Sequence, residues 1–230
     1  MYWILIFIIV AAFLVWASAD VGSGVYIKTL CRIRTDKPHI ALTFDDGPDA
    51  VMTPRVLDIL DRYGVKATFF LVGEKVRMNP DIVRRMVDAG HIIGNHTYTH
   101  SVLFPLSDRR SVQKEIEDTQ QVVNDIAGIR MHLFRPPFGV TNPIIGDVVR
   151  NCGLQTVGWS VRSLDTFGCR SREAVLGRIK HKLHKGAIVL LHDRCNDADV
   201  LLERLLQELA KCNMRVVALD ELFGIKRYES

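Results

Sequence analysis

The stretch His39-Ile-Ala-Leu-Thr-Phe-Asp-Asp-Gly-Pro48 decides the fold. Apolar and β-branched residues fill its first part, which is typical of a buried strand. The strand ends in two adjacent carboxylates, Asp45 and Asp46, and Gly47-Pro48 then turns the chain sharply away. Paired carboxylates in such a place are costly unless something cationic uses them. The sequence therefore predicts a functional site at the end of this strand.

The same order, a short apolar run followed by a capped amphipathic stretch, repeats to the C-terminus. This alternation predicts a parallel α/β protein. We expect seven strands, over residues 39–44, 67–73, 91–95, 132–134, 155–159, 187–191 and 214–219. Caps and prolines predict helices that begin at Thr53, Asn79, Ser107, Asn142, Ser171 and Asp197. Because the chain has no glycine-rich phosphate loop and no evident break in the middle, the pattern favours a closed or nearly closed barrel over an open doubly wound sheet.

Composition narrows the class of protein. The 230 residues, 48% hydrophobic and 24% charged, suit one globular domain with a single core. The 30 basic and 26 acidic residues are spread along the chain, so the net charge of +4 does not indicate a nucleic-acid partner. No obligate protein partner is evident. The odd number of cysteines and the lack of CxxC spacing predict neither a disulfide framework nor a thiolate metal site. Core or surface thiols are expected at Cys31, Cys152, Cys169, Cys195 and Cys212.

A second polar motif, Gly94-Asn-His96-Thr-Tyr-Thr-His100, follows the third predicted strand. Its two imidazoles can converge on one ion if the segment takes a helical turn. Taken alone, the pair fits two ordinary surface or core histidines better than it fits a metal site. Together with the Asp-Asp strand end it becomes a strong signal, because two histidines and one carboxylate form a facial set that leaves positions open for water and substrate.

Three further motifs place polar residues just after apolar runs, where an α/β barrel gathers its reactive groups. In Phe134-Arg-Pro-Pro-Phe-Gly139 a lone arginine meets a rigid double proline, which by itself fits a surface turn. The fourth motif is Trp159-Ser-Val-Arg-Ser-Leu-Asp165. In Ile188-Val-Leu-Leu-His-Asp193 a β run ends in a histidine, which is only modestly unusual.

In this order, over residues 39–193, the five motifs resemble the polysaccharide deacetylase family, also called the NodB-homology family of carbohydrate esterases. Thr-Phe-Asp-Asp-Gly-Pro and His-Thr-x-x-His are nearly signatures of that family, and Arg-Pro-Pro-Phe-Gly and Leu-Leu-His correspond to its third and fifth motifs. The resemblance implies an α/β fold, a deformed (β/α)7 barrel that is TIM-barrel-like. It also implies a polysaccharide N-deacetylase, a hydrolase that removes N-acetyl groups from an amino-sugar polymer such as peptidoglycan, a chitin-like chain or an exopolysaccharide.

The resemblance also implies roles for residues of the motifs. A divalent metal ion, often zinc in such enzymes, with cobalt or another divalent ion as alternatives, would be held by three side chains: Asp46, His96 and His100. Asp45 is expected to act as the general base toward the attacking water, and Arg135 to orient that carboxylate. His192 is expected to be the general acid that protonates the departing amine, with Asp165 as its carboxylate partner.

Three residues are expected to contact the substrate. The backbone N–H of Phe138 would help to hold the oxyanion, Leu190 would line the pocket for the acetyl methyl, and Trp159 would add a wall on which a sugar stacks. The sequence departs from the family pattern in two motifs. Phe138 stands where tyrosine is frequent, and Asp165-Thr-Phe replaces the Asp-Trp pair of many members. The second change bears on the position of Asp165 and on the aromatic floor of the substrate groove.

Two other functions fit parts of the pattern. An inactive carbohydrate-binding barrel would share the fold, but it would not need Asp45 and His192 beside a complete set of metal ligands. An amidohydrolase of a small cyclic amide would use a similar site on a related barrel. Offering acetylated oligosaccharides and a cyclic imide distinguishes the two enzymes.

Residues 1–19 are expected to be a signal-anchor or a signal peptide, followed by a linker over 20–37 and the catalytic domain over 38–230. No charged side chain occurs between Tyr2 and Ala19. The length of this segment is near the lower limit of roughly 17 apolar residues for crossing a bilayer. Ala17-Ser-Ala19 resembles a cleavage site, but the usual basic region before it is absent, so an uncleaved anchor is slightly favoured. We expect a membrane-anchored or secreted protein whose catalytic domain faces the cell envelope, although basic residues after the apolar segment leave its orientation open.

Overall fold

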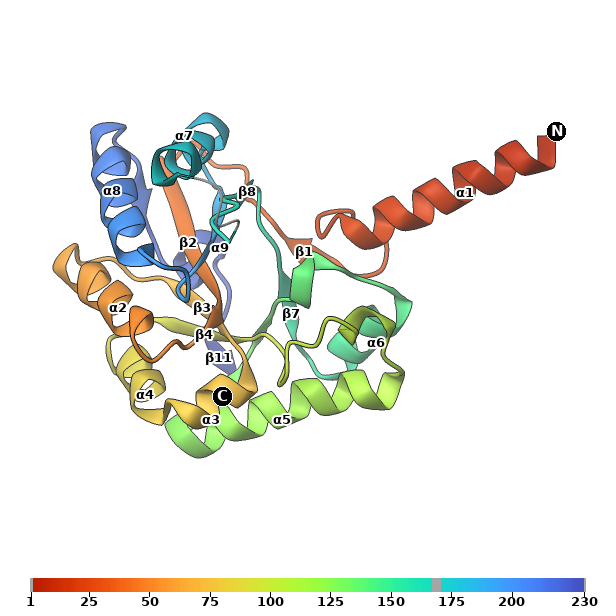
Figure 1. Ribbon diagram of the computed structural model, residues 1–230, viewed down its shortest axis with the longest axis horizontal. Helices are drawn as coiled ribbons and strands as arrows, with labels where there is room; N and C mark the ends of the chain where they lie inside the picture. The colour runs from red at the N-terminus through yellow and green to blue at the C-terminus, as the bar shows by residue number, and fades with distance from the viewer. Residues whose placement is uncertain (1, 167–170, 230) are drawn as a thin grey trace.

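The computed structural model describes residues 2–166 and 171–229. Its main sheet has the strand order β1-β7-β6-β4-β3-β2-β9-β8, with β10 attached to β2, and these strands pair in parallel (Figure 1). The strands are β1 (Thr29–Leu30), β2 (His39–Gly47), β3 (Thr68–Leu71), β4 (Ile92–Asn95), β6 (Leu133–Phe134), β7 (Gln155–Val157), β8 (Val161–Arg162), β9 (Ile188–His192) and β10 (Arg215–Val216). A separate antiparallel pair joins β5 (Arg130–Met131) to β11 (Tyr228–Glu229).

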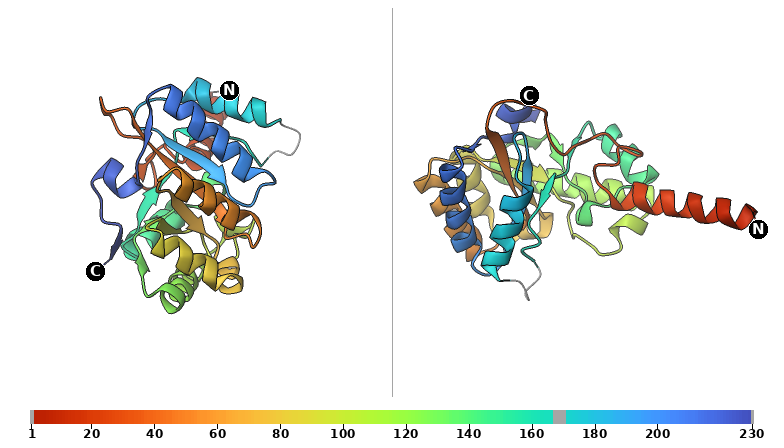
Figure 2. Two further views of the ribbon diagram at one scale, coloured as in Figure 1. Left: turned by 90° about the vertical axis from the view of Figure 1, so that its left-hand side faces the viewer. Right: turned by 90° about the horizontal axis from the view of Figure 1, so that it is seen from above.

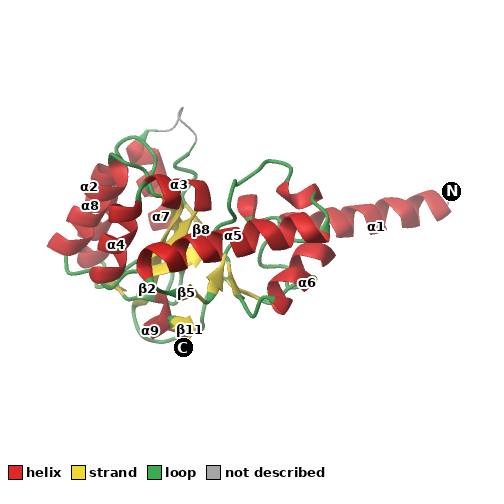
Figure 3. Cartoon of the chain, turned by 90° about the horizontal axis from the view of Figure 1, so that it is seen from below, coloured by secondary structure: helices red, strands yellow, loops and turns green. Residues whose placement is uncertain are grey.

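Helices cover the outer side of this curled sheet (Figure 3). Most of them connect one parallel strand to the next, as parallel pairing requires. The helices of the domain are α2 (Met52–Arg62), α3 (Gly73–Met78), α4 (Pro80–Asp88), α5 (Arg109–Ala127), α6 (Pro143–Asn151), α7 (Arg172–Lys182), α8 (Ala198–Lys211) and α9 (Leu219–Phe223). Two single turns of 3-10 helix, η1 (Phe104–Leu106) and η2 (Pro137–Gly139), lie in the connections.

The sheet is the predicted deformed (β/α)7 barrel, and it does not close. Within the described residues no ladder joins β7 to β8, and β1 pairs with β7 in that place. The chain after β1 continues along the opening, where the N–H of Ile33 donates to the carbonyl of Gly186 at 3.0 Å and Arg32 forms a bridge with Ala187. Part of the segment 20–37, which we expected as a linker, is therefore built into the sheet.

Strand β2 separates two cores because successive residues of a strand point to opposite faces. Its outward residues pack under the helices: Ile40, Leu42 and Phe44. On the inner face Ala41 packs with Phe70 of β3. By the same alternation Thr43 and Asp45 point inward, so the barrel interior changes from apolar to polar toward the C-terminal end of the strand. Burial on both faces thus fixes the strand that carries the carboxylates.

Several element boundaries differ from the predicted ones. The last expected strand, 214–219, is only as long as β10, because the chain then turns into α9, whose Leu219 and Leu222 close the inner core. Helix α2 begins at Met52, and the hydroxyl of Thr53 donates to Asp193 at 2.6 Å instead of capping the helix. Asp108 rather than Ser107 caps α5.

Other helix starts agree with the prediction. The side chains of Asn142 and Ser171 cap α6 and α7, as expected. Asn79 and Asp197 precede α4 and α8 at the predicted positions, but neither side chain forms a capping hydrogen bond. The cysteines within the described residues are free thiols: Cys31, Cys152, Cys195 and Cys212. The remaining one, Cys169, lies outside the described residues.

Helix α1 (Tyr2–Ala19) projects away from the domain (Figures 1 and 2). Of the described helices it is the one long and apolar enough to cross a membrane, with a mean hydropathy of 2.4. Its last turn is attached to the domain. The N–H of Thr141 donates to the carbonyl of Ser18 at 2.9 Å, and the side chain of Ala17 is fully buried.

We predict that Gly47→Ala destabilises the fold by about 1–3 kcal/mol, the usual cost of overpacking. A Cβ at Gly47 would lie 2.3 Å from Oδ2 of Asp193, a fully buried carboxyl that the Thr53 hydroxyl holds in place. The matched control is Gly177→Ala on the exposed side of α7, where a Cβ meets nothing within 4 Å. That change should stabilise by about 0.5–1 kcal/mol. Chemical denaturation measures both, and shifts of the same sign would contradict the packing explanation.

Candidate metal and active site

The predicted site residues gather at the C-terminal ends of β2, β4 and β9. In the pairing of β2 with β9, Asp45 lies directly opposite His192. A cavity of about 160 Å³ opens there. It is lined by Asp45, Asp46, His96, His100, Phe138, Gly139, Trp159, Arg162, Thr166, Leu190, His192 and Arg194. The other two predicted residues, Arg135 and Asp165, lie behind this lining and contact Asp45 and His192.

A bulge in β2 brings both carboxylates to one side. Adjacent residues of a regular strand point to opposite faces, so Asp45 and Asp46 would normally diverge. Here the register between β2 and β3 shifts between Asp45 and Gly47, and Asp46 has a left-handed φ of 70°. A residue that is extra in one strand bends the strand and redirects side chains. Both carboxylates therefore face His96, with Asp45 Oδ2 at 3.9 Å and Asp46 Oδ1 at 3.5 Å from its Nε2 atom.

Asp46, His96 and His100 form a compact set of candidate metal ligands. Oδ1 of Asp46 lies 3.3 Å from Nε2 of His100, and one ligand atom from each residue lies within 4.8 Å of the others. The two imidazoles converge without a helical turn, which the sequence analysis gave as the condition for their convergence. The segment between them is an irregular loop in which Thr97 and His100 both have left-handed φ values.

The surroundings of these three side chains favour the binding of a cation. Nδ1 of His96 lies 2.7 Å from the carbonyl oxygen of Arg135, which can only accept, so the ring is oriented with its Nε2 toward Asp46. Burial and the neighbouring His96 lower the pKa of His100 to about 4. Burial would raise the pKa of Asp46, but the nearby imidazoles outweigh it and hold that pKa well below its usual range. One carboxylate and two imidazoles form a ligand set that suits zinc and similar divalent ions.

Arg135 is fully buried and binds Asp45 inside the barrel. One guanidinium nitrogen donates to Asp45 Oδ1 at 2.6 Å and to the Thr43 hydroxyl at 2.9 Å. The other two nitrogens donate to the carbonyls of Val157 and Gly158, at 3.1 and 2.7 Å. The guanidinium carbon also lies 4.1 Å from the ring centre of a phenylalanine of β3. The carboxylate of Asp45 is thereby fixed in orientation on one oxygen, and the other oxygen remains directed to the cavity side.

His192 and Asp165 form a hydrogen-bonded pair. Nδ1 of His192 lies 2.8 Å from Asp165 Oδ1, and the backbone N–H of His192 donates to Asp165 Oδ2 at 2.9 Å. The Ser163 hydroxyl also donates to Asp165. Burial alone would lower the pKa of His192, but the Asp165 carboxylate, helped by the charges of Asp45 and Asp46, raises it above the ordinary value. The altered fourth motif thus still places its carboxylate against His192.

Aromatic side chains form part of the cavity wall. Phe138 has a left-handed φ of 61°, is 45% exposed, and meets His100 edge to face with 4.9 Å between ring centres. Its ring is therefore in direct contact with a candidate ligand. Trp159 packs over Gly139, and the guanidinium of Arg162 lies 5.7 Å from its ring centre. Leu190 is buried at the base of the cavity wall.

Three basic residues in or beside the cavity were not identified from the sequence. Arg194 donates from Nε to Asp46 Oδ2 at 2.8 Å, and Arg162 lines the same cavity. Lys75 donates from Nζ to the backbone carbonyl of Asp46 at 2.6 Å. Arg194 stands two residues after His192, yet its residue type and spacing do not distinguish it from a surface arginine. Lys75 lies on α3, a helix that was not predicted.

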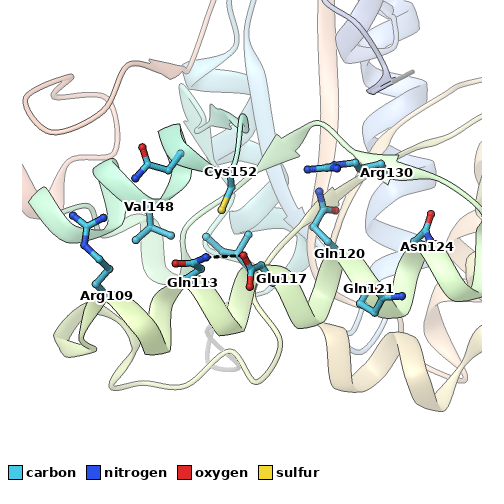
Figure 4. A pocket seen from close by; sticks show the side chains of 11 residues that line it. Arg109, Gln113, Glu117, Gln120, Gln121, Asn124, Arg130, Val148 and Cys152 are labelled. Atoms are coloured by element: carbon cyan, nitrogen blue, oxygen red, sulfur yellow. Dashed lines mark hydrogen bonds between the residues drawn. The ribbon is translucent and has the colours of Figure 1, made fainter.

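Cavity size does not identify the site. A larger hollow of about 560 Å³ lies between α5 and α6 (Figure 4). Its lining includes four amide side chains of α5, and the side chain of the labelled Gln113 donates to Glu117 at 2.7 Å. It lies in the outer helix layer, away from the strand ends that carry the motifs. The smaller cavity is the candidate site because the paired carboxylates and imidazoles are there.

Known proteins share these motifs and this fold. A family model described as polysaccharide deacetylase matches residues 32–157. The chain belongs to the polysaccharide deacetylase family. Among its relatives in that family, peptidoglycan-N-acetylglucosamine deacetylase PgdA of Listeria monocytogenes is 37% identical over 204 residues. That match covers 89% of this chain and 42% of the relative, so the chain spans less than half of that protein's length.

Two more members of the polysaccharide deacetylase family match over most of their length. A peptidoglycan-N-acetylglucosamine deacetylase of Bacillus cereus is 37% identical over 199 residues, covering 85% of this chain and 92% of the relative. The crystal structure of the Bc1960 peptidoglycan N-acetylglucosamine deacetylase superimposes with a TM-score of 0.81 and 29% identity. It covers 94% of this chain and 98% of the other. The likeness therefore extends over the whole barrel.

We predict that Asp165→Asn lowers the pKa of His192 in the metal-free protein. The raised pKa depends on the Asp165 charge and on its hydrogen bond to Nδ1, and a neutral amide removes the charge that favours the imidazolium. NMR titration of the imidazole measures the change. Asp220→Asn, which removes a carboxylate bound to Arg227 instead, is the matched control and should leave the value unchanged. An unchanged pKa in Asp165→Asn would contradict this explanation.

Proposed function

We propose that the protein is a polysaccharide N-deacetylase that uses a divalent metal ion, with zinc as the first candidate. The observation that carries the proposal is one cavity in which Asp46, His96 and His100 converge beside Asp45 and His192. When bound to these ligands, the ion would supply an acidified water and polarise the acetamide carbonyl. Proton transfer and substrate binding are proposed to be carried out by side chains and backbone groups of the protein.

Asp45 is the proposed general base. Its Oδ1 is held by Arg135, and its Oδ2 lies 3.9 Å from His96 Nε2, on the side of the metal ligands. The guanidinium donates a charge-assisted hydrogen bond to Oδ1 and so leaves Oδ2 as the oxygen that would accept a proton from the attacking water. Arg135 is thus proposed to orient the base without contacting the substrate.

His192 is the proposed general acid. His192 lies opposite Asp45 in the pairing of β2 with β9, so the proposed base and the proposed acid flank the same space. The raised pKa of His192 favours the protonated imidazole, which is the form that can donate to the departing amine. The Asp165 carboxylate accepts a hydrogen bond from Nδ1 of His192, and this contact directs Nε2 of His192 to the cavity side. Because the proposed mechanism needs Asp45 ionised and His192 protonated, the pH profile of kcat/KM should be bell-shaped.

Three residues are proposed to hold the substrate. The backbone N–H of Phe138 would help to stabilise the oxyanion, a role supported by its left-handed conformation beside His100. Leu190 would contact the acetyl methyl, and Trp159 would stack on a sugar ring. All three line the cavity.

The proposed substrate is an acetylated amino-sugar polymer of the cell envelope, with peptidoglycan as the first candidate. The relatives whose names specify N-acetylglucosamine of peptidoglycan support this choice. Helix α1 further supports a membrane-anchored protein, because its 18 residues measure about 27 Å, close to the thickness of the hydrocarbon core.

The deciding experiment is acetate release from a panel of substrates by the full chain, after chelation and metal add-back. We expect release from acetylated glucosamine oligomers and peptidoglycan fragments, loss on chelation, and recovery with zinc or another divalent ion. Consumption of a cyclic imide alone would favour the cyclic amidohydrolase. Stoichiometric metal binding without turnover of any substrate would favour an inactive carbohydrate-binding barrel.

Variants in the same assay separate ligands from acid and base. Asp46→Ala and His96→Ala should lose both bound metal and turnover, because three protein ligands leave no redundancy. Asp45→Asn and His192→Ala should retain metal and lose a factor on the order of 10² to 10⁴ in rate. Full metal content and activity in Asp46→Ala would reject the proposed ligand set.

The anchor prediction is tested by fractionation. Full-length protein should sediment with membranes and resist alkaline carbonate extraction, because an apolar span is held by the hydrocarbon core rather than by charge. Mature protein that begins at Asp20 would establish cleavage of a signal peptide instead.

A further inference from the structure

The two oxygens of Asp46 have different partners. Oδ1 lies 3.5 and 3.3 Å from the Nε2 atoms of His96 and His100, on the side where the candidate ligand atoms meet. Oδ2 points the other way and accepts a hydrogen bond from Nε of Arg194 at 2.8 Å. One carboxylate is thus shared between the metal-ligand set and a guanidinium.

The position of Arg194 is set by its neighbours in the loop after β9. His192 is fixed by two hydrogen bonds to Asp165, and Asp193 is fully buried against Gly47, with the Thr53 hydroxyl bonded to its carboxyl. Because the two preceding residues are held in this way, the Arg194 side chain begins at a defined place. The side chain reaches Asp46, lines the cavity, and is 43% exposed.

The backbone of Asp46 alone does not determine how its carboxylate turns. Its left-handed φ and the bond from Lys75 to its carbonyl fix the main chain, but the side chain can rotate to offer a metal one oxygen or both. A donor bonded to Oδ2 removes that freedom and leaves Oδ1 as the oxygen that faces the imidazoles. Hydrogen bonds to ligating groups commonly orient the ligand and tune its affinity for the metal.

We infer that Arg194 is a positioning residue that holds Asp46 as a one-oxygen metal ligand. The inference rests on the proposed metal-dependent function and adds a residue to it that the five motifs do not include. The charge of Arg194 opposes a nearby cation, whereas the fixed carboxylate favours it. Because Asp46 supplies the one carboxylate of the set, the orientation is the larger effect, and removal of the arginine weakens metal binding.

The test is the metal dissociation constant of purified full-length protein, measured by competition with a chelator for zinc. Arg194→Ala should weaken zinc binding by about 10- to 100-fold, the usual effect of losing a hydrogen bond to a ligand. Arg194→Lys keeps the charge and a donor and should recover part of the loss. Arg162→Ala, which removes the other arginine of the cavity but has no bond to Asp46, should leave zinc affinity unchanged.

Each outcome decides the inference. Unchanged or tighter zinc binding by Arg194→Ala would overturn it, and so would a raised KM with unchanged zinc affinity, which would make Arg194 a substrate contact. An equal loss of zinc affinity in Arg162→Ala would also overturn it, because the effect would then be a general one of cavity charge. Melting temperatures of the metal-free variants show whether a change in affinity follows from unfolding. Wild-type protein that binds no divalent ion would reject the proposed function itself, a result distinct from the others.

Discussion

The buried contact between Arg135 and Asp45 is the interaction on which the rest of the site depends. An arginine with no exposed surface is tolerated only where its donors are satisfied and its charge is paired. Two of its acceptors, the carbonyls of Val157 and Gly158, lie at the C-terminal end of β7. The end of this strand therefore supplies the oxygens that allow the guanidinium to be buried.

Arg135 also connects the two halves of the proposed chemistry. Its side chain holds one oxygen of Asp45, while its own carbonyl accepts from His96. The proposed base and a candidate metal ligand are thus oriented by the same residue. Because the contact is buried and charged, a change at this position has consequences for both the fold and the site.

The sequence was most informative where local chemistry and the strand pattern agree. Strand β2, its terminal carboxylates and the caps of α6 and α7 follow from apolar runs and side chains that bond to nearby backbone. The short β8 and α3 were not predicted, because two- and six-residue elements carry too little periodicity and depend on neighbours distant in sequence. The contact of Arg194 with Asp46 joins residues 148 positions apart, so no local pattern reveals it. The bulge at Asp46 likewise depends on the register with β3.

The contacts between the end of α1 and the domain determine how the domain is held relative to this helix. The Thr141 bond to Ser18 lies three residues along the chain from Phe138, and Ser23 bonds back to the carbonyl of Ala17. In the membrane-anchored form proposed above, these contacts would hold the domain against the end of the helix. The proposed catalytic cavity would then stay close to one distance from the lipid and move along the membrane with α1. Polymer segments at that distance would be modified repeatedly, and those further out would be reached only when they themselves move inward.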